Sequence, residues 1–440
     1  MRAAAVVVRH AAPPALRGDG MALALTPVDI NHRETIMQKT SFWKAGHTPT
    51  LFAAFFYFDL SFMVWVILGP LAVQIAADLG LSPAQKGLMV ATPLLAGALL
   101  RIVMGVLVDH LKPKKAGLIG QVIVMLGLLW AWQGSLDSYA SLIALGVVLG
   151  VAGAAFAVAL PLASRWYPPE HQGTALGIAG AGNSGTAFAA LFAPSLAIAF
   201  GWQNVFGLCL IPLAIAFAVY LAMAKDAPGA PPPKALTEYL RVLRDKDAWW
   251  FMFFYSVTFG GFSGLASSLT IYFNGEYGLA PVTAGYLTAG CVFAGSVVRP
   301  VGGWLADRIG GIRTLSMMYA AAAGALLVAS TGMHSYAGAV AVFVAAMLAL
   351  GTGNGAVFQL VPQRFRKEIG MMTGLVGMAG GIGGFYLASS LGVSRQLTGS
   401  YQLGLTAFAA LALIALFGLS AVKGRWRTTW GSAAMTTAKV

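Results

Sequence analysis

Two arginines lie deep in apolar stretches of the sequence, where an ionised side chain is costly. Arg101 and Arg299 each precede an aspartate by eight residues, Asp109 and Asp307, and the two stretches are 198 residues apart. A guanidinium near the centre of a membrane helix costs roughly 2.5–3.5 kcal/mol, so it normally faces protein or water and serves a function. Its planar fork of paired donors suits a planar oxyanion. The pair therefore predicts a binding site for a small anion.

Each arginine could instead be neutralised by an acid or donate to backbone carbonyls. Among the 15 Asp and Glu residues, only Asp59 lies well inside an apolar segment, so neutralisation of both arginines is disfavoured. A lone carboxyl in such a place either takes up and releases protons or ties its helix to a neighbour by a hydrogen bond. The sequence leaves both roles of Asp59 open.

The elements that must position these residues are membrane helices. Of the 440 residues, 58% are hydrophobic and 10% are charged, compared with roughly 25% charged residues in a soluble domain. An apolar segment of about 20 residues crosses the hydrocarbon core as a helix, because no other open segment satisfies its own backbone. We expect twelve such helices, at residues 50–77, 86–108, 115–134, 139–166, 173–200, 203–224, 248–274, 283–306, 312–332, 336–361, 369–392 and 402–422.

The basic residues fall almost entirely in one set of loops. Apart from Arg101 and Arg299, only Lys86 and Arg395 of the 28 Lys and Arg residues lie elsewhere. This asymmetry predicts a multi-pass protein of the cell inner (plasma) membrane with both termini in the cytoplasm. The net charge of +13 then reflects orientation in a lipid bilayer, and we expect no nucleic-acid partner.

A Pro-rich, charged linker divides the chain into two similar halves, and glycine runs repeat in both. Such parallel six-helix halves are the plan of the major facilitator transporters, which bind substrate at mid-depth between them. We therefore predict an all-α polytopic fold with a cytoplasmic tail at 1–47, whose first 36 residues are disordered or precede the true start. The first half spans 48–224, the linker 225–247, the second half 248–422 and a cytoplasmic tail 423–440.

Glycines occupy matching positions in the fifth and eleventh predicted helices. Gly182 and Gly185 lie 198 residues before Gly380 and Gly383. Small residues let membrane helices approach closely and slide, as two rocking halves must. Ordinary tight packing is the alternative, but a run at matching positions in both halves favours a conformational role.

These features together resemble the nitrate/nitrite porter family of the major facilitator superfamily. The likeness covers about residues 38–422 and includes the two arginines, both glycine runs and the stretch FYSVTF at 254–259. It implies that Arg101 and Arg299 grip the anion, and that Asn183 and Tyr255 add hydrogen bonds. It further implies that Phe156 and Phe259 close the site above and below. Without the resemblance, these four residues would be read as interhelical contacts or core.

The segments that follow the two arginines are similar to the superfamily's cytoplasmic loop signature. That likeness makes Asp109 and Asp307 gating residues, which hold one conformation through charge contacts and release it in the other. Simple solvation of a helix end is the alternative.

We therefore expect a monomeric secondary transporter of nitrate, and of nitrite as well, that works by alternating access. Uptake by nitrate/proton symport is favoured over nitrate/nitrite antiport, and a sensor without transport is less favoured. No enzyme activity, cofactor or metal is expected, because the histidines lie in the tail or at helix ends and the two cysteines can form at most one bridge.

Overall fold

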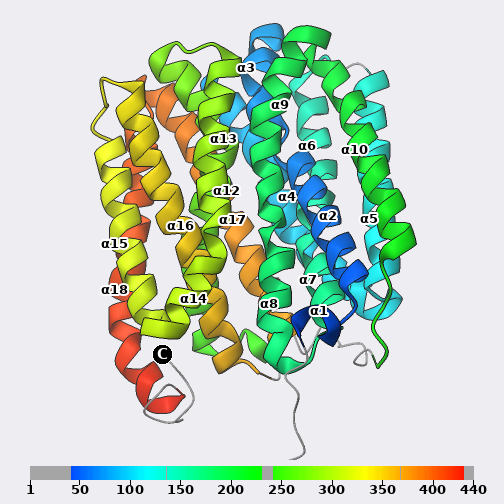
Figure 1. Ribbon diagram of the computed structural model, residues 1–440. Helices are drawn as coiled ribbons and strands as arrows, with labels where there is room; N and C mark the ends of the chain where they lie inside the picture. Colours follow the sequence, from blue (N-terminus) through cyan, green and yellow to red (C-terminus); the bar gives the residue numbers. More distant parts are fainter. Residues whose placement is uncertain (1–40, 135, 230–240, 367, 431–440) are drawn as a thin grey trace, which may run out of the picture. The chain divides into compact units, whose positions relative to one another are not determined.

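The computed structural model describes residues 41–134, 136–229, 241–366 and 368–430. The predicted first 36 residues, part of the linker and the end of the C-terminal tail lie outside this range. The described residues from Phe42 onward form one unit, which Figure 1 shows as a bundle of upright helices. The elements of its first part are α1 (Phe42–Ala45), α2 (Thr48–Trp65), α3 (Leu68–Leu79), α4 (Pro83–Leu111), α5 (Pro113–Gln133), α6 (Tyr139–Gly153), α7 (Phe156–Ser164), α8 (Pro169–Gly180), the 3₁₀ turn η2 (Ala181–Ser184), α9 (Gly185–Phe200) and α10 (Trp202–Met223).

The second part repeats this plan. Its helices are α12 (Lys246–Tyr277), α13 (Pro281–Val297), α14 (Arg299–Ile309), α15 (Gly311–Ala329), α16 (Tyr336–Arg364), α17 (Ile369–Thr398) and α18 (Gln402–Thr429). When helices that continue one another are joined, each half has six helical units within the described residues. The predicted all-α fold of two six-helix halves is thus confirmed.

Eleven of these units are long and apolar enough to cross a membrane. The predicted segment 248–274 falls on α12, a helix of 32 residues that is not among the eleven. Glycine, serine and threonine dilute its apolar residues, and nearly all of its length between Phe251 and Phe273 is buried. The helix is enclosed by protein, so its polar side chains need not face lipid.

Helix ends follow local sequence signals. At the start of α4, the side chain of Ser82 accepts a hydrogen bond from the backbone N–H of Gln85, and the side chain of Gln85 accepts one from the backbone N–H of Ser82. This capping box, followed by a proline in the first turn, fixes where the helix begins. Gly80 ends α3 with φ 64° and Gly278 ends α12 with φ 63°, in the left-handed region that glycine adopts without steric cost.

Four of the units are interrupted near their middle. Breaks occur between α2 and α3, between α6 and α7, at η2 and between α13 and α14. The last break precedes Pro300, which lacks the N–H that would continue the helix. Interrupted backbone within a membrane protein is tolerated where it is buried in protein or lines a cavity. The breaks therefore mark the middle of the bundle as the place to look for a site.

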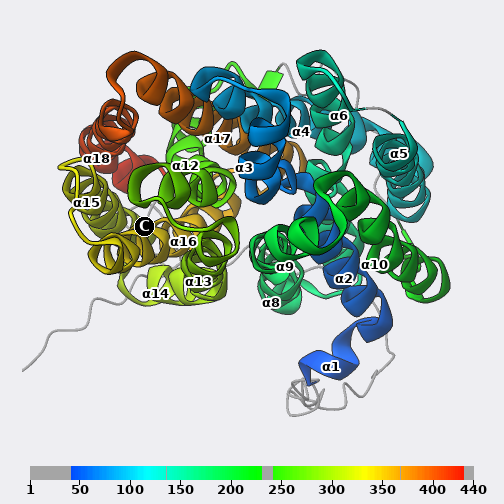
Figure 2. The ribbon, with the colours of Figure 1, turned by 90° about the horizontal axis from the view of Figure 1, so that it is seen from above.

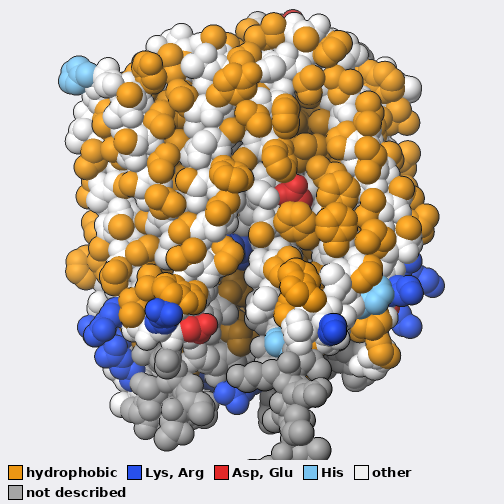
Figure 3. Space-filling view, viewed as in Figure 1, with side chains coloured by type: hydrophobic (Ala, Val, Ile, Leu, Met, Phe, Trp, Pro, Cys, Tyr) orange, Lys and Arg blue, Asp and Glu red, His pale blue; other side chains and the backbone are white. Residues whose placement is uncertain are grey.

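The two halves meet along α3, α4 and α9 of the first and α12, α13 and α17 of the second, as Figure 2 shows from above. We call the end that carries Lys112, Arg165 and Arg364 the basic end, and the other the far end. Near the far end a Cβ on Gly87 would lie 2.7 Å from the Cα of Gly392. Figure 3 shows the basic side chains gathered at one end and a hollow between the halves that opens toward it. The structure is thus closed at the far end.

This contact yields a first prediction. Gly87→Val should push α4 and α17 apart, because no space exists for a larger side chain. Distances between spin labels at the exposed positions Ala77 and Leu397 should lengthen in electron resonance measurements. Gly290→Val is the matched control, since a Cβ there meets no atom within 4 Å. An unchanged distance distribution in Gly87→Val would refute the role of this contact as the far-end seal.

Candidate functional site

Arg101 is the most deeply buried cation of the described chain, at 1% exposure. Its Nε donates to the carbonyl of Gly153 at 3.2 Å, and its Nη1 donates to the carbonyl of Gly377 in the other half. Its Nη2 is buried and has no hydrogen-bond partner. The alternative that Arg101 caps backbone carbonyls is therefore true of two nitrogens, while the third remains available.

Arg299 is half-buried and lies at the start of α14, beside the break before Pro300. Its Nη2 donates to the hydroxyl of Tyr255 at 3.2 Å, and its Nη1 is buried without a partner. Its Cζ would lie 3.9 Å from a Cβ on Gly180, in the first half. Each arginine thus reaches the opposite half.

No ion pair of the described residues involves either arginine. The two guanidinium groups are close enough for their charges to interact with each other and with Tyr255. The prediction that both arginines are free of acids and converge therefore agrees with the geometry.

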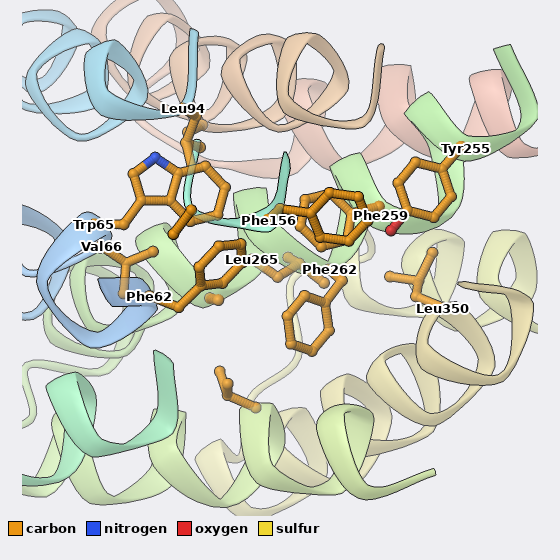
Figure 4. Close-up of a cluster of buried hydrophobic side chains, with 14 of the residues drawn as sticks. Phe62, Trp65, Val66, Leu94, Phe156, Tyr255, Phe259, Phe262, Leu265 and Leu350 are labelled. Carbon is orange, nitrogen blue, oxygen red and sulfur yellow. The ribbon is translucent and has the colours of Figure 1, made fainter. Parts of the chain in front are cut away.

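Aromatic rings surround the Arg101 guanidinium. Its Cζ lies 5.0 Å from the ring centre of Phe156, 5.3 Å from that of Phe259 and 5.6 Å from that of Trp65, all within the roughly 6 Å of a cation–π contact. Tyr255 stacks on Phe259 at 5.2 Å. Figure 4 shows these four aromatic residues in one buried cluster drawn from both halves. Rings that exclude water strengthen the electrostatic contacts of the arginines.

Two of the aromatic residues around the arginines were not predicted from the sequence. Trp65 is fully buried and donates from Nε1 to the carbonyl of Pro93 at 2.7 Å. Phe358 of α16 lies 5.7 Å from the Cζ of Arg299 and packs against Phe156 and Tyr255. Position 354 stands 198 residues after Phe156, and Phe358 lies one helical turn beyond it. An alignment of the two repeats along α16 would therefore have drawn attention to Phe358.

Asn183 and Asp59 lie on two packed elements of the first half. Asn183 is in η2 at 1% exposure, and its Oδ1 is buried without a partner. The amide N–H₂ group of an asparagine can donate to an anion, whereas Oδ1 can only accept. The neighbouring Ser184 donates to Oδ1 of Asp59 at 2.6 Å. Asp59, at 4% exposure, is therefore tied to the turn that carries Asn183, and both of its predicted roles are compatible with this bond.

The four predicted glycines make tight contacts within their own halves. A Cβ on Gly185 would overlap the carbonyl oxygen of Asp59, and one on Gly380 would lie 2.8 Å from ring atoms of Tyr255 and Phe259. Gly182 packs in the same way on Phe58, and Gly383 on Ser256. Between the halves stand other glycines, of which Gly381 would place a Cβ 2.7 Å from that of Ala98.

The two predicted gating aspartates differ. Asp109 pairs with Arg165 at 3.5 Å, which joins the ends of α4 and α7 at the basic end. Asp307 is exposed near the end of α14. Neither lies among the residues that surround the two arginines.

The arrangement can hold one small anion. Each guanidinium offers one buried, unpartnered N–H group, and the two groups come from opposite halves. Both groups are positive and no carboxylate of the described residues pairs with either, so a planar anion that accepted from both would satisfy the donors and offset the repulsion.

Known proteins provide an independent comparison. Residues 51–388 match the profile described as "Major Facilitator Superfamily". The chain is 34% identical to the "Probable nitrate/nitrite transporter NarK2" of Mycobacterium tuberculosis (strain CDC 1551 / Oshkosh), over 84% of this chain and 95% of that protein. It is also 34% identical to the "Nitrite extrusion protein" of Bacillus subtilis (strain 168), over 80% of this chain and 88% of that protein.

A solved structure supports the fold alone. The crystal structure of a bacterial homolog to the human lysosomal transporter Spinster, in an inward-facing and occupied conformation, aligns with a TM-score of 0.66 at 17% identity. The alignment covers 87% of this chain and 97% of that chain.

The newly found Phe358 provides a second prediction. Phe358→Leu should weaken binding of nitrate, because it removes a ring that holds the Arg299 guanidinium in place, and the cation–π energy of about 0.5–2 kcal/mol sets the loss at no more than roughly 2- to 30-fold. Isothermal titration of the purified protein measures this change. Phe417→Leu, at a side chain that is 70% exposed, is the matched control. Wild-type binding by the Phe358 variant would remove this ring from the site.

Proposed function

This chain belongs to the nitrate/nitrite porter family of the major facilitator superfamily, and we propose that it carries nitrate, and also nitrite, across the plasma membrane. It is a multi-pass membrane transporter and not an enzyme. The relatives named above bear names that refer to nitrate/nitrite transport and nitrite extrusion, which supports this class of substrate.

One observation carries the proposal. Arg101 and Arg299 come from opposite halves, each keeps one buried N–H group without a partner, and no described carboxylate pairs with either. A small planar oxyanion with oxygens on every edge is the ligand that two such forks fit. Asn183 and Tyr255 add uncharged polar groups, and the rings of Phe156 and Phe259 exclude water.

Electrostatics then links binding to alternating access. Two like unit charges repel by roughly 4 kcal/mol at 4 Å for an effective dielectric constant of about 20, and by less at larger separations. The empty site resists bringing the halves together around the arginines, whereas a bound anion lowers this repulsion. Closure is therefore favoured with substrate present, and the carrier returns either with an exchange anion or with a change in protonation.

The same proposal includes orientation. The halves 48–224 and 248–422 rock about the arginine site, and the basic end faces the cytoplasm, in keeping with the excess of Lys and Arg there. In this assignment the structure, which is closed at the far end, is an inward-facing state. Asp109 with its partner Arg165 acts at the cytoplasmic gate together with Asp307.

Asp59 is the group that favours proton symport over nitrate/nitrite antiport. It is buried, it has no cation partner among the described ion pairs, and its bond to Ser184 connects it to the turn that carries Asn183. Protonation of Asp59 removes a negative charge from that neighbourhood, which alters how strongly a nearby anion is held. Uptake driven by protons would supply nitrate reduction.

A third prediction tests the arginine pair. Arg101→Lys and Arg299→Lys should each lose most nitrate transport in proteoliposomes, about 10-fold or more, because the charge remains but the planar fork is lost. Both variants should elute from size-exclusion columns as wild type does. Transport at the wild-type rate in either variant contradicts the shared-anion site.

A fourth prediction separates the two roles of Asp59. Asp59→Asn keeps an oxygen that accepts from Ser184, so a purely structural role predicts unchanged transport. Proton coupling predicts that Asp59→Asn loses nitrate uptake driven by an imposed pH gradient while it retains exchange of labelled nitrate for internal nitrate. Ser184→Ala, which breaks the bond but keeps the carboxyl group, is the control. If Asp59→Asn responds to the pH gradient as wild type does, antiport becomes the better assignment.

A further inference from the structure

The far end of the bundle holds a second place where cations from both halves converge. A cavity of about 190 Å³ lies between α4, α12 and α17, whereas one water requires only roughly 10–15 Å³ of such space. Lys86 of α4, Arg395 of α17 and Ser268 of α12 line it. Lys86 and Arg395 are also the two basic residues that the charge asymmetry leaves at this end.

Arg395 is fixed in place by its neighbours. Its Nη1 donates to Glu276 at 3.3 Å and to the carbonyl of Gly399, and its Nη2 donates to the carbonyl of Gly275 at 3.1 Å. Its Cζ lies 5.3 Å from the ring centre of Tyr401. The guanidinium is therefore held at the wall of the cavity, with its charge partly balanced by one carboxylate.

Lys86 and Ser268 retain unused hydrogen-bonding capacity. Lys86 is half-buried and takes part in none of the ion pairs of the described residues. It is close enough to Arg395 for the two charges to interact. The hydroxyl of Ser268 is buried without a partner in a residue that is 4% exposed. The charges of Lys86 and Arg395 exceed that of Glu276 by one positive charge. The ammonium group of Lys86 and the hydroxyl of Ser268 are free to donate hydrogen bonds.

We propose that this cavity is a second anion site, in which Lys86 and Ser268 bind a small monovalent oxyanion beside the anchored Arg395. The site lies directly over the contact of Gly87 with Gly392 that closes the far end. An anion held between Lys86 of one half and Arg395 of the other screens their repulsion and stabilises the closed far end. When that end opens, the same charges concentrate anions at the mouth of the pathway. The transport role of this site rests on the function proposed above.

The test compares nitrate flux at the two faces of the membrane, in vesicles of both orientations. At low ionic strength, Lys86→Gln should raise the KM for nitrate about 3- to 10-fold at one face only, with the maximal rate unchanged. The effect should shrink as potassium gluconate is added, because salt screens exposed charges beyond about 3 Å at 1 M. Lys86→Arg should resemble wild type, and Ser268→Ala should raise the KM at the same face.

Lys423→Gln is the matched control, since it removes one exposed positive charge at the basic end and should leave both KM values unchanged. An unchanged KM in Lys86→Gln, or an equal rise at both faces, overturns the second site. A second measurement is independent of transport. In the Arg299→Lys variant, which disables the central site, nitrate should slow the acylation of the Lys86 amine by a small acylating reagent such as acetic anhydride. Peptide mass spectrometry measures this rate. If nitrate does not slow this acylation, the second site is overturned. If the wild-type protein carries no nitrate, the proposed function is refuted instead, and the acylation result still decides on the second site.

Discussion

The structure depends on two positive charges, one buried and one half-buried, that no carboxylate of the described residues pairs with. Arg101 and Arg299 each hold part of their fork on protein groups and keep one N–H group free. A buried charge is expensive unless it is paired and hydrogen-bonded. In the proposed function an anion from outside the chain supplies this partner and stabilises the region around the arginines. The same proposal couples anion binding to the approach of the two halves.

The rest of the fold serves this constraint. The interruptions of α6/α7, η2 and α13/α14 place Phe156, Asn183 and Arg299 at element ends near the middle of the bundle, where side chains can point inward from regular helices on either side. Close glycine contacts bring η2 against α2 and α17 against α12. The hydrogen bond from Ser184 to Asp59 thus joins the carboxyl group to the turn that carries Asn183.

Much of this was predictable from sequence because it is local or repeated. Apolar runs located the helices, and the 198-residue repeat paired Arg101 with Arg299. The repeat does not predict how the surroundings of the two arginines differ or how the two halves contact each other. The repeat implies equal arginines, yet Pro300 breaks the helix at Arg299 whereas Arg101 lies inside the continuous α4. Likewise Phe358 enters the site by packing on Phe156 and Tyr255, and only its place in the repeat, one helical turn after the position that matches Phe156, distinguishes it from other phenylalanines.

A structure of the protein determined by electron cryo-microscopy in the presence of nitrate tests the central claim most directly. The account predicts density for one planar anion within hydrogen-bond distance of Nη2 of Arg101 and Nη1 of Arg299, bounded by the rings of Phe156 and Phe259. Density for nitrate elsewhere, with those two nitrogen atoms bonded to protein groups instead, would contradict it.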